Sequence, residues 1–179
     1  LPASVVGIRE LKQIEDNKYQ LTSTAKSFFA SVTEQSIFAV DEEQIVPLEY
    51  QYKRTGIGKN RKVILTFDHE AGVVKSEVKP WEIAFSGKTL DKLLYQFRMR
   101  EDLQIALENG RPWPLMNYKV ADGGRIKNYN FKVTGEELID TPVGKIATVK
   151  AVRIRKDGER STTFWLAPHY EFMLVRLLQ

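Results

Sequence analysis

The sequence predicts an α+β protein dominated by β structure. A strongly curved antiparallel sheet, a half-barrel of about ten strands, is expected to wrap around one central helical region. Two observations support this fold class. Segments of alternating apolar and polar residues, separated by turn-forming residues, fill most of the 179 residues. One window, Lys88–Gly110, has a helical pattern instead. A sheet with this many strands has to curl or close, and the helix would fill its concave side.

The first half of the chain is expected to be a series of strands joined by short turns. Asp16-Asn17 and the loop Gly56–Asn60 have the residue types of tight turns. Because consecutive strands joined by short turns usually pair with each other, we expect an antiparallel meander. The expected strands here are Ile8–Asp16, Lys18–Ala30, Gln35–Val40, Gln44–Thr55, Arg61–Asp68, Val73–Val78 and Trp81–Phe85.

The helical window carries two apolar stripes. The first consists of Leu90, Leu93, Leu94 and Phe97, and the second, on the opposite side, of Met99, Leu103, Ala106 and Leu107. The simpler interpretation is two short core helices with a break near Arg98–Asp102. The alternative is one helix covered on two sides. Thr89 is the expected N-cap, and Asn109-Gly110 the expected left-handed end.

After the helix the strands resume, at Leu115–Ala121, Arg125–Thr134, Lys145–Arg155, Ser161–Ala167 and Tyr170–Leu178. Asp157-Gly158 predicts a hairpin between two of them. Phe164–Leu166 and Phe172–Val175 are apolar on both faces. An antiparallel strand with one wet face should alternate. We therefore expect burial on two sides, by the helix, by an adjoining layer or by a ligand.

The composition is that of a single globular domain spanning residues 1–179, with 42% hydrophobic and 28% charged residues. No apolar run is long enough to predict a transmembrane segment. The chain begins at Leu1, which fits an exported protein whose signal peptide has been removed and fits a trimmed chain equally well. The absence of cysteine excludes disulfides and thiolate chemistry.

No motif indicates catalysis or a metal, so we expect no enzyme activity, no cofactor and no metal site. His69 and His169 are one hundred residues apart in turns, without metal-ligand spacing. Ser86 lies in no nucleophile elbow. The acidic pairs, such as Glu101-Asp102, are adjacent in sequence and therefore point apart.

Two basic stretches flank expected hairpin tips, at Lys53–Lys62 and Arg153–Arg160. The first, beside Tyr50 and Tyr52, has the composition of a surface for nucleic acid or anionic lipid. Lysines at tips and edges also protect a sheet against self-association. We favour this second interpretation and expect no nucleic-acid partner.

Large apolar side chains could line a groove between the sheet and the helix, although residues of this kind more often form plain core. The candidate ligand-binding residues are Phe67, Trp81, Tyr95, Phe97, Met99, Trp113 and Trp165.

The chain from about Pro47 onward resembles the bacterial exported domain-of-unknown-function family 3108. One departure is His69, at a position where tryptophan is familiar in the family. The segments that carry the resemblance are Pro47–Arg54 with Gly56–Lys59, Leu65–Asp68, Asp91–Leu93 with Leu103, Tyr118–Asp122 with Gly124–Lys127, Val133–Glu137, Thr141–Gly144, Thr148–Lys150, Trp165–Pro168 and Leu174–Arg176.

The resemblance implies an exported, periplasmic protein and supplies no catalytic residues. The implied shape is similar to the half-barrel of periplasmic lipoprotein carriers, although a shared fold does not fix function. We therefore expect a non-enzymatic protein that binds an apolar or acyl-bearing ligand between sheet and helix. The alternative is a cell-envelope interaction or assembly factor with a filled core and no small-molecule ligand. An unrecognised hydrolase is the weakest interpretation.

Overall fold

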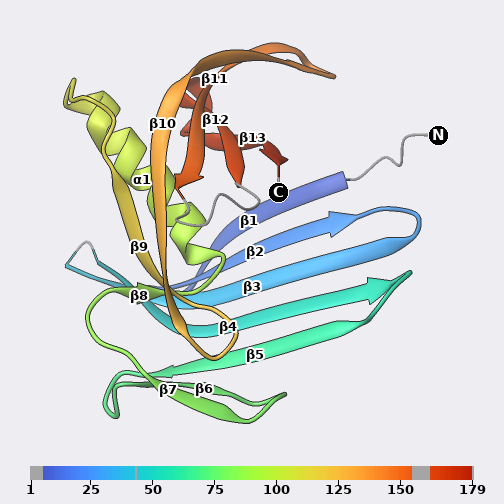
Figure 1. Ribbon diagram of the computed structural model, residues 1–179, viewed down its shortest axis with the longest axis vertical. Coiled ribbons are helices and arrows are strands. Elements are labelled where there is room, and N and C mark those ends of the chain that lie inside the picture. Colours follow the sequence, from blue (N-terminus) through green and yellow to red (C-terminus); the bar gives the residue numbers. More distant parts are fainter. Residues whose placement is uncertain (1–5, 43, 155–161, 179) are drawn as a thin grey trace. The chain divides into compact units, whose positions relative to one another are not determined.

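The computed structural model describes residues 6–42, 44–154 and 162–178, which fall into two compact units (Figure 1). The first unit contains Leu1–Tyr95 and Lys119–Lys127, and the second contains Gln96–Tyr118 and Asn128–Gln179. That the whole chain forms a single domain stays a prediction.

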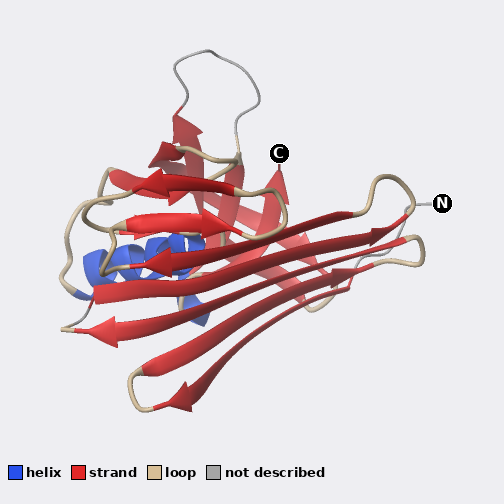
Figure 2. Ribbon diagram, turned by 90° about the horizontal axis from the view of Figure 1, so that it is seen from below, coloured by secondary structure: helices blue, strands red, loops and turns tan. Residues whose placement is uncertain are grey.

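Sheet A belongs to the first unit and contains seven antiparallel strands that neighbour each other in sequence order, seen side by side in Figure 2. This is the predicted meander. The strands are β1 (Val6–Glu15), β2 (Lys18–Lys26), β3 (Ala30–Asp41), β4 (Gln44–Gly56), β5 (Arg61–Asp68), β6 (Val73–Ser76) and β7 (Trp81–Ala84).

The two faces of sheet A differ in polarity. Leu21, Ser36, Tyr50 and Leu65 lie opposite one another on successive strands and are all buried. Side chains alternate along a strand, so residues one position away point to the other face. We call the face that carries these four buried residues the apolar face and the opposite face the polar face. On β2 the polar face carries Lys18, Gln20, Thr22, Thr24 and Lys26.

Sheet B has six strands in the order β13-β12-β11-β10-β9-β8 and curls into a half-barrel. Most of it belongs to the second unit, but the short parallel pairing of Thr89 with Lys119 and of Leu90 with Val120 lies in the first. Its elements are β8 (Thr89–Leu90), β9 (Met116–Ala121), β10 (Ile126–Thr141), β11 (Gly144–Ile154), β12 (Thr163–Ala167), the 3-10 helix η1 (Pro168–Tyr170) and β13 (Met173–Leu178).

The helix α1 spans Leu94–Glu108 without interruption, so the favoured prediction of two short helices is wrong. Leu93 and Leu94 of the first apolar stripe and Met99 and Leu103 of the second are buried, as expected for a helix covered on two sides. Gly110 has a positive φ of 58° and ends the helix as predicted.

The predicted N-cap is wrong by two residues. Thr89 lies in β8, and Asp91 caps α1 instead: its Oδ1 accepts hydrogen bonds from the backbone N–H groups of Leu93 and Leu94, both at 2.8 Å. An N-cap of this kind contributes about 1 kcal/mol of stability. The cap also places the carboxyl group of Asp91 in the interior.

The predicted fold class is confirmed: the protein is mostly β, with one helix and a curled sheet. The described strands number thirteen, against about ten expected, and are divided between two sheets. The hairpin predicted at Asp157-Gly158 lies outside the described residues.

Candidate functional site

The seven residues predicted to line a ligand groove are divided between the two units. Phe67 on β5, Trp81 on β7 and Tyr95 at the start of α1 belong to the first unit, and Phe97, Met99, Trp113 and Trp165 to the second. Phe67, Tyr95, Met99 and Trp165 are buried, whereas Trp81, Phe97 and Trp113 are half-buried. That these residues line a common groove stays a prediction.

In the first unit, Phe67 and Trp81 contact other parts of the same unit. The ring of Phe67 packs edge-on against Phe85, with ring centroids 5.9 Å apart, and Phe85 in turn contacts the ring of His69. The indole of Trp81 lies against Gly124, where an added Cβ would lie 3.7 Å from the ring. These contacts are those of packed core residues.

Trp165 shows why β12 is apolar on both faces. Its neighbour Phe164 contacts Phe131 with ring centroids 5.6 Å apart, in the aromatic core of the second unit. Trp165 points to the opposite face and is only 4% exposed. Its Nε1–H donates to Glu137 Oε2 at 2.8 Å, and the Lys150 and Arg176 cations lie 5.3 and 4.9 Å from its ring centroid. Side chains of the neighbouring strands β11 and β13 therefore cover Trp165 on this second face.

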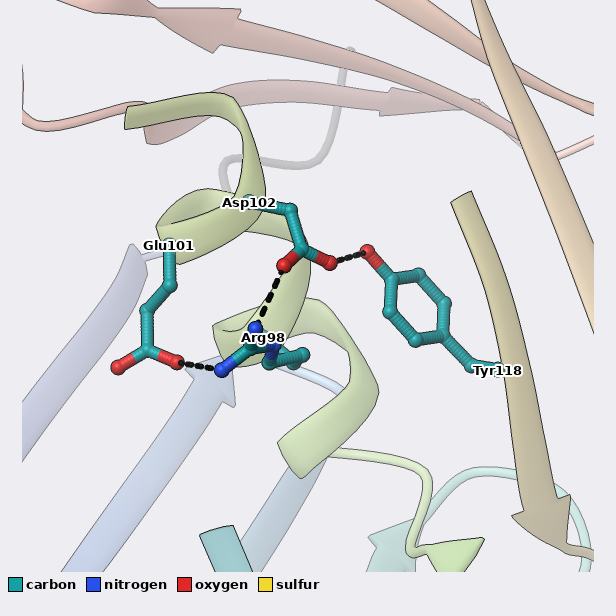
Figure 3. Close-up of polar contacts among 4 residues, drawn as sticks. All are labelled: Arg98, Glu101, Asp102 and Tyr118. Carbon is teal, nitrogen blue, oxygen red and sulfur yellow. Dashed lines mark hydrogen bonds and ion pairs between the residues drawn. The ribbon is translucent and has the colours of Figure 1, made fainter. Parts of the chain in front are cut away.

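A polar network ties α1 to β9 in the second unit (Figure 3). Asp102 accepts a hydrogen bond from the Tyr118 hydroxyl at 2.7 Å and pairs with Arg98 at 2.9 Å. Arg98 also reaches Glu101, at 3.4 Å. Burial, and then the nearby charge of Asp102, raises the pKa of Tyr118. Both oxygens of Asp102 are used, so this network holds the helix on the sheet.

The most unusual polar group in the first unit is Asp91. Besides the two N–H groups of α1, its Oδ1 accepts a hydrogen bond from Ser36 Oγ at 2.9 Å. Its second oxygen, Oδ2, is buried and has no hydrogen-bond partner among the described residues, and the same is true of the Tyr50 hydroxyl on the apolar face. Burial, with a smaller contribution from the carboxylate of Glu34, raises the pKa of Asp91 to about 7, although the hydrogen bonds to Oδ1 lower it.

The surroundings of Asp91 contain further charges. Burial raises the pKa of Glu34, while the nearby cations of Lys92 and Arg9 lower it. Lys92 forms an ion pair with Asp122 at 2.8 Å, and Asp122 also pairs with Lys127 at 2.7 Å. Since Oδ1 is fully occupied, a proton taken up by Asp91 would sit on Oδ2. A perturbed carboxyl group can mark a functional site, but here capping explains its burial.

The sequence reasoning missed the role of Asp91. The predicted N-cap was Thr89, and Asp91 was not placed in the core. The signal that could have found it is an aspartate two and three residues before the apolar pair Leu93-Leu94, which is the spacing of a capping side chain. Ser36 and Tyr50 could not have been joined to it without the register of sheet A.

The two histidines belong to different units. His69 Nε2 lies 2.6 Å from the carbonyl oxygen of Pro47, so this nitrogen carries the proton and donates. His169 is exposed in η1. Among the described residues, no group of histidine and acidic side chains could hold a metal ion.

The turns β2–β3 and β4–β5 lie at the same end of sheet A (Figure 1). This end exposes both apolar and basic side chains. Phe28, Phe29 and Ile57 are exposed in the two turns. Nearby on the polar face, Ile8, Glu10, Thr22, Thr24 and Lys26 line a shallow hollow of about 180 Å³. It contains none of the predicted groove residues.

None of the described helices is long and apolar enough to span a membrane. The chain matches no curated protein and no solved structure. A family model described as "Protein of unknown function (DUF3108)" matches residues 5–179, and the chain therefore belongs to this family.

Proposed function

We propose that this protein is a non-enzymatic interaction or assembly factor of the bacterial cell envelope, working in the periplasm through its surface. The observation that carries the proposal is β1, a ten-residue strand at the edge of sheet A. Among the described strands it pairs only with β2. The other long strands of this sheet have a neighbour on each side.

An exposed edge strand presents unpaired backbone donors and acceptors to an extended segment of another chain. Proteins that do not use such an edge usually protect it with a short strand, a proline, charged side chains or a β-bulge. β1 has charged side chains such as Lys12 and a register shift between Gln13 and Glu15, but its other features favour pairing. β1 is long, contains no proline, and exposes the apolar side chains of Ile8, Leu11 and Ile14. A partner strand would gain backbone hydrogen bonds along this edge and apolar contacts with these side chains.

The packing of the predicted groove residues supports surface binding over an internal ligand. Four of the seven are buried, and Trp165 is covered by charged side chains of its own sheet. The buried carboxyl group of Asp91 has the structural task of capping α1. These assignments leave few groups in either unit free for a ligand or for catalysis.

Binding of an apolar or acyl-bearing ligand is the second candidate function. It is favoured by two half-buried aromatic side chains of the second unit, Phe97 and Trp113, which a ligand could reach. Saturable uptake of a fluorescent fatty acid, reduced by Trp113→Asp but not by the exchange of an exposed residue such as Leu115→Asp, would support it.

Site-specific photocrosslinking in bacterial cells tests the edge-strand proposal. A photoreactive amino acid at Leu11 should give one adduct of defined mass, and the same probe at Val143, an exposed apolar residue in the turn after β10, should not. Adding Ile8→Lys should reduce the Leu11 adduct, since it places a charge on the same edge. Equal adducts from Leu11 and Val143, or none from Leu11, would contradict the proposal.

A further inference from the structure

Three large apolar side chains at the β2–β3 and β4–β5 turns are exposed to solvent. Phe28 is 95% exposed, Ile57 69% and Phe29 53%. The two phenylalanine rings pack edge to face with centroids 5.2 Å apart. Single exposed apolar residues are common on protein surfaces, but three of them gathered on adjoining turns indicate an interaction surface.

The two turns are held together as one structural element. The backbone N–H of Ile57 donates to the Phe29 carbonyl oxygen at 2.8 Å. Gly56, with φ of 110°, permits this approach, because a Cβ at this position would overlap the Phe29 carbonyl oxygen and the Ala30 Cα. The three apolar side chains are therefore mounted on one preorganised surface. We call residues 26–33 and 53–62 together the hairpin end.

Several polar backbone groups of the β2–β3 turn have partners within the protein. Ser27 Oγ accepts hydrogen bonds from the N–H groups of Phe29, at 3.3 Å, and of Ala30, at 3.1 Å. The Ser27 N–H donates to the Ala30 carbonyl oxygen at 2.9 Å. A turn whose backbone groups already have partners can enter a medium poor in water at a lower free-energy cost.

The charge of the hairpin end has one sign. It contains six cationic side chains and no carboxylate, and all six are exposed. Taking these six charges from the net charge of +4 leaves −2 for the remainder of the chain. The six residues are Lys26, Lys53, Arg54, Lys59, Arg61 and Lys62.

Protection of a sheet edge does not account for all of these charges. Lys53 and Arg54 lie on β4, paired on one side with Thr33 and Val32 and on the other with Lys62 and Arg61. Like charges placed directly opposite each other across two strands are destabilising. Sheet A thus holds two unfavourable pairs, Lys53 with Lys62 and Arg54 with Arg61, beside its most exposed apolar residues.

We propose that the hairpin end docks onto an anionic phospholipid bilayer, with Phe28, Phe29 and Ile57 entering the interface and the six cations contacting lipid phosphates. The hairpin end has apolar residues at its tip and cations behind them. This matches the two layers of a bilayer surface, because aromatic side chains lie below the lipid headgroups and Lys and Arg lie among the headgroups. A single-stranded nucleic acid could use the cations and stack its bases on the two phenylalanines, but it would leave the aliphatic side chain of Ile57 without a role.

Sedimentation with vesicles tests the proposal on the full chain. Binding is expected with phosphatidylcholine vesicles that contain phosphatidylglycerol, should be weak with phosphatidylcholine alone, and should fall with added salt. Phe28→Ser together with Phe29→Ser should weaken binding at least tenfold, and Lys59→Glu by about fivefold or more. Both turns are exposed, and circular dichroism would verify that the variants fold.

The turn between β10 and β11 provides matched controls. Val143 is 84% exposed there, and Lys145 is an exposed cation at the same tip. Val143→Ser and Lys145→Glu should leave vesicle binding unchanged. Equal losses from the control variants would overturn the proposal. So would wild-type binding that does not depend on phosphatidylglycerol, or tight binding to a single-stranded oligonucleotide without binding to vesicles.

A fluorescent label shows which part of the protein contacts the vesicle. Since the chain lacks cysteine, Asn60→Cys creates a single attachment site for an environment-sensitive probe in the β4–β5 turn. The probe should shift to the blue on phosphatidylglycerol vesicles, whereas the same probe on Asn109→Cys, after α1, should not. A shift at Asn109 without one at Asn60 would contradict docking through the hairpin end.

Discussion

Sheet A has a buried part and an exposed end built on the same strands, and the two differ in what their side chains contribute. The buried part consists of Ser36, Tyr50 and Leu65 on the apolar face of the sheet, which are almost completely removed from water. Asp91, which is bonded to Ser36, is buried with them. At the hairpin end, phenylalanine and isoleucine are exposed and cations face each other across strands. The comparison indicates that the buried part stabilises the sheet, whereas the hairpin end gives up stability in favour of binding.

The largest expected effect comes from the buried part. Leu65→Ala should lower the free energy of unfolding by about 2–5 kcal/mol, because it leaves a cavity in a packed core. Ile57→Ala, an exchange of an exposed residue, should change it by less than about 0.5 kcal/mol. Urea unfolding measures both, and similar losses for the two variants would break the comparison.

A second effect depends on pH. A carboxyl group in an unfolded chain has a pKa near 4, whereas burial raises that of Asp91 to about 7. Between these values the folded state holds a proton that the unfolded state has released. Stability should therefore fall as the pH rises from about 4 to about 7, by on the order of a few kcal/mol, and should level off above this range. Asp91→Asn keeps an oxygen for the cap and should remove most of this fall. An unchanged pH dependence of unfolding in this variant would contradict the assignment.

Gly56 lies within the hairpin end, where the β4–β5 turn approaches the β2–β3 turn. Gly56→Ala should lower the free energy of unfolding by about 1–3 kcal/mol, because φ is positive and the added Cβ overlaps the Phe29 carbonyl group. The matched exchange Gly87→Ala also has a positive φ but meets no atom within 4 Å. Thermal unfolding should therefore show a smaller loss for Gly87→Ala, and the reverse order would contradict the close approach of the two turns.

The smallest effect has the opposite sign. Lys62→Thr removes a like charge opposite Lys53 and should raise the free energy of unfolding by about 0.2–1 kcal/mol while weakening vesicle binding. Lys75→Thr, on β6, removes an ion pair with Asp68 at 3.0 Å and should bring no gain. A loss of stability in Lys62→Thr would show that the cation is there for the fold.

Much of the fold could be predicted from local patterns. The alternation of apolar and polar residues predicted the strands of sheet A, because each strand has one apolar and one polar face. Gly110 predicted the end of the helix, because glycine tolerates a positive φ. The single helix was only the less favoured alternative, because two apolar stripes on opposite sides also fit two short helices. Only burial of both sides, as at Leu94 and Met99, distinguishes the two.

The site was harder to predict, because it depends on contacts between residues distant in sequence. The contact of Ser36 with Asp91 joins residues 55 positions apart and needs the strand register. The basic stretch at Lys53–Lys62 was recognised, but Phe28 and Phe29 were absorbed into a predicted strand. Their meeting with Ile57 follows only from the hydrogen bond between the two turns.

The central claim is that the protein works through its surface and does not carry an apolar ligand inside. Native mass spectrometry of the protein purified from bacterial cells, followed by organic extraction, tests this most directly. The account predicts the mass of the chain with no lipid retained at a fixed ratio. A lipid bound one to one, and lost on Phe97→Glu in a variant that still folds, would contradict the account and favour a carrier.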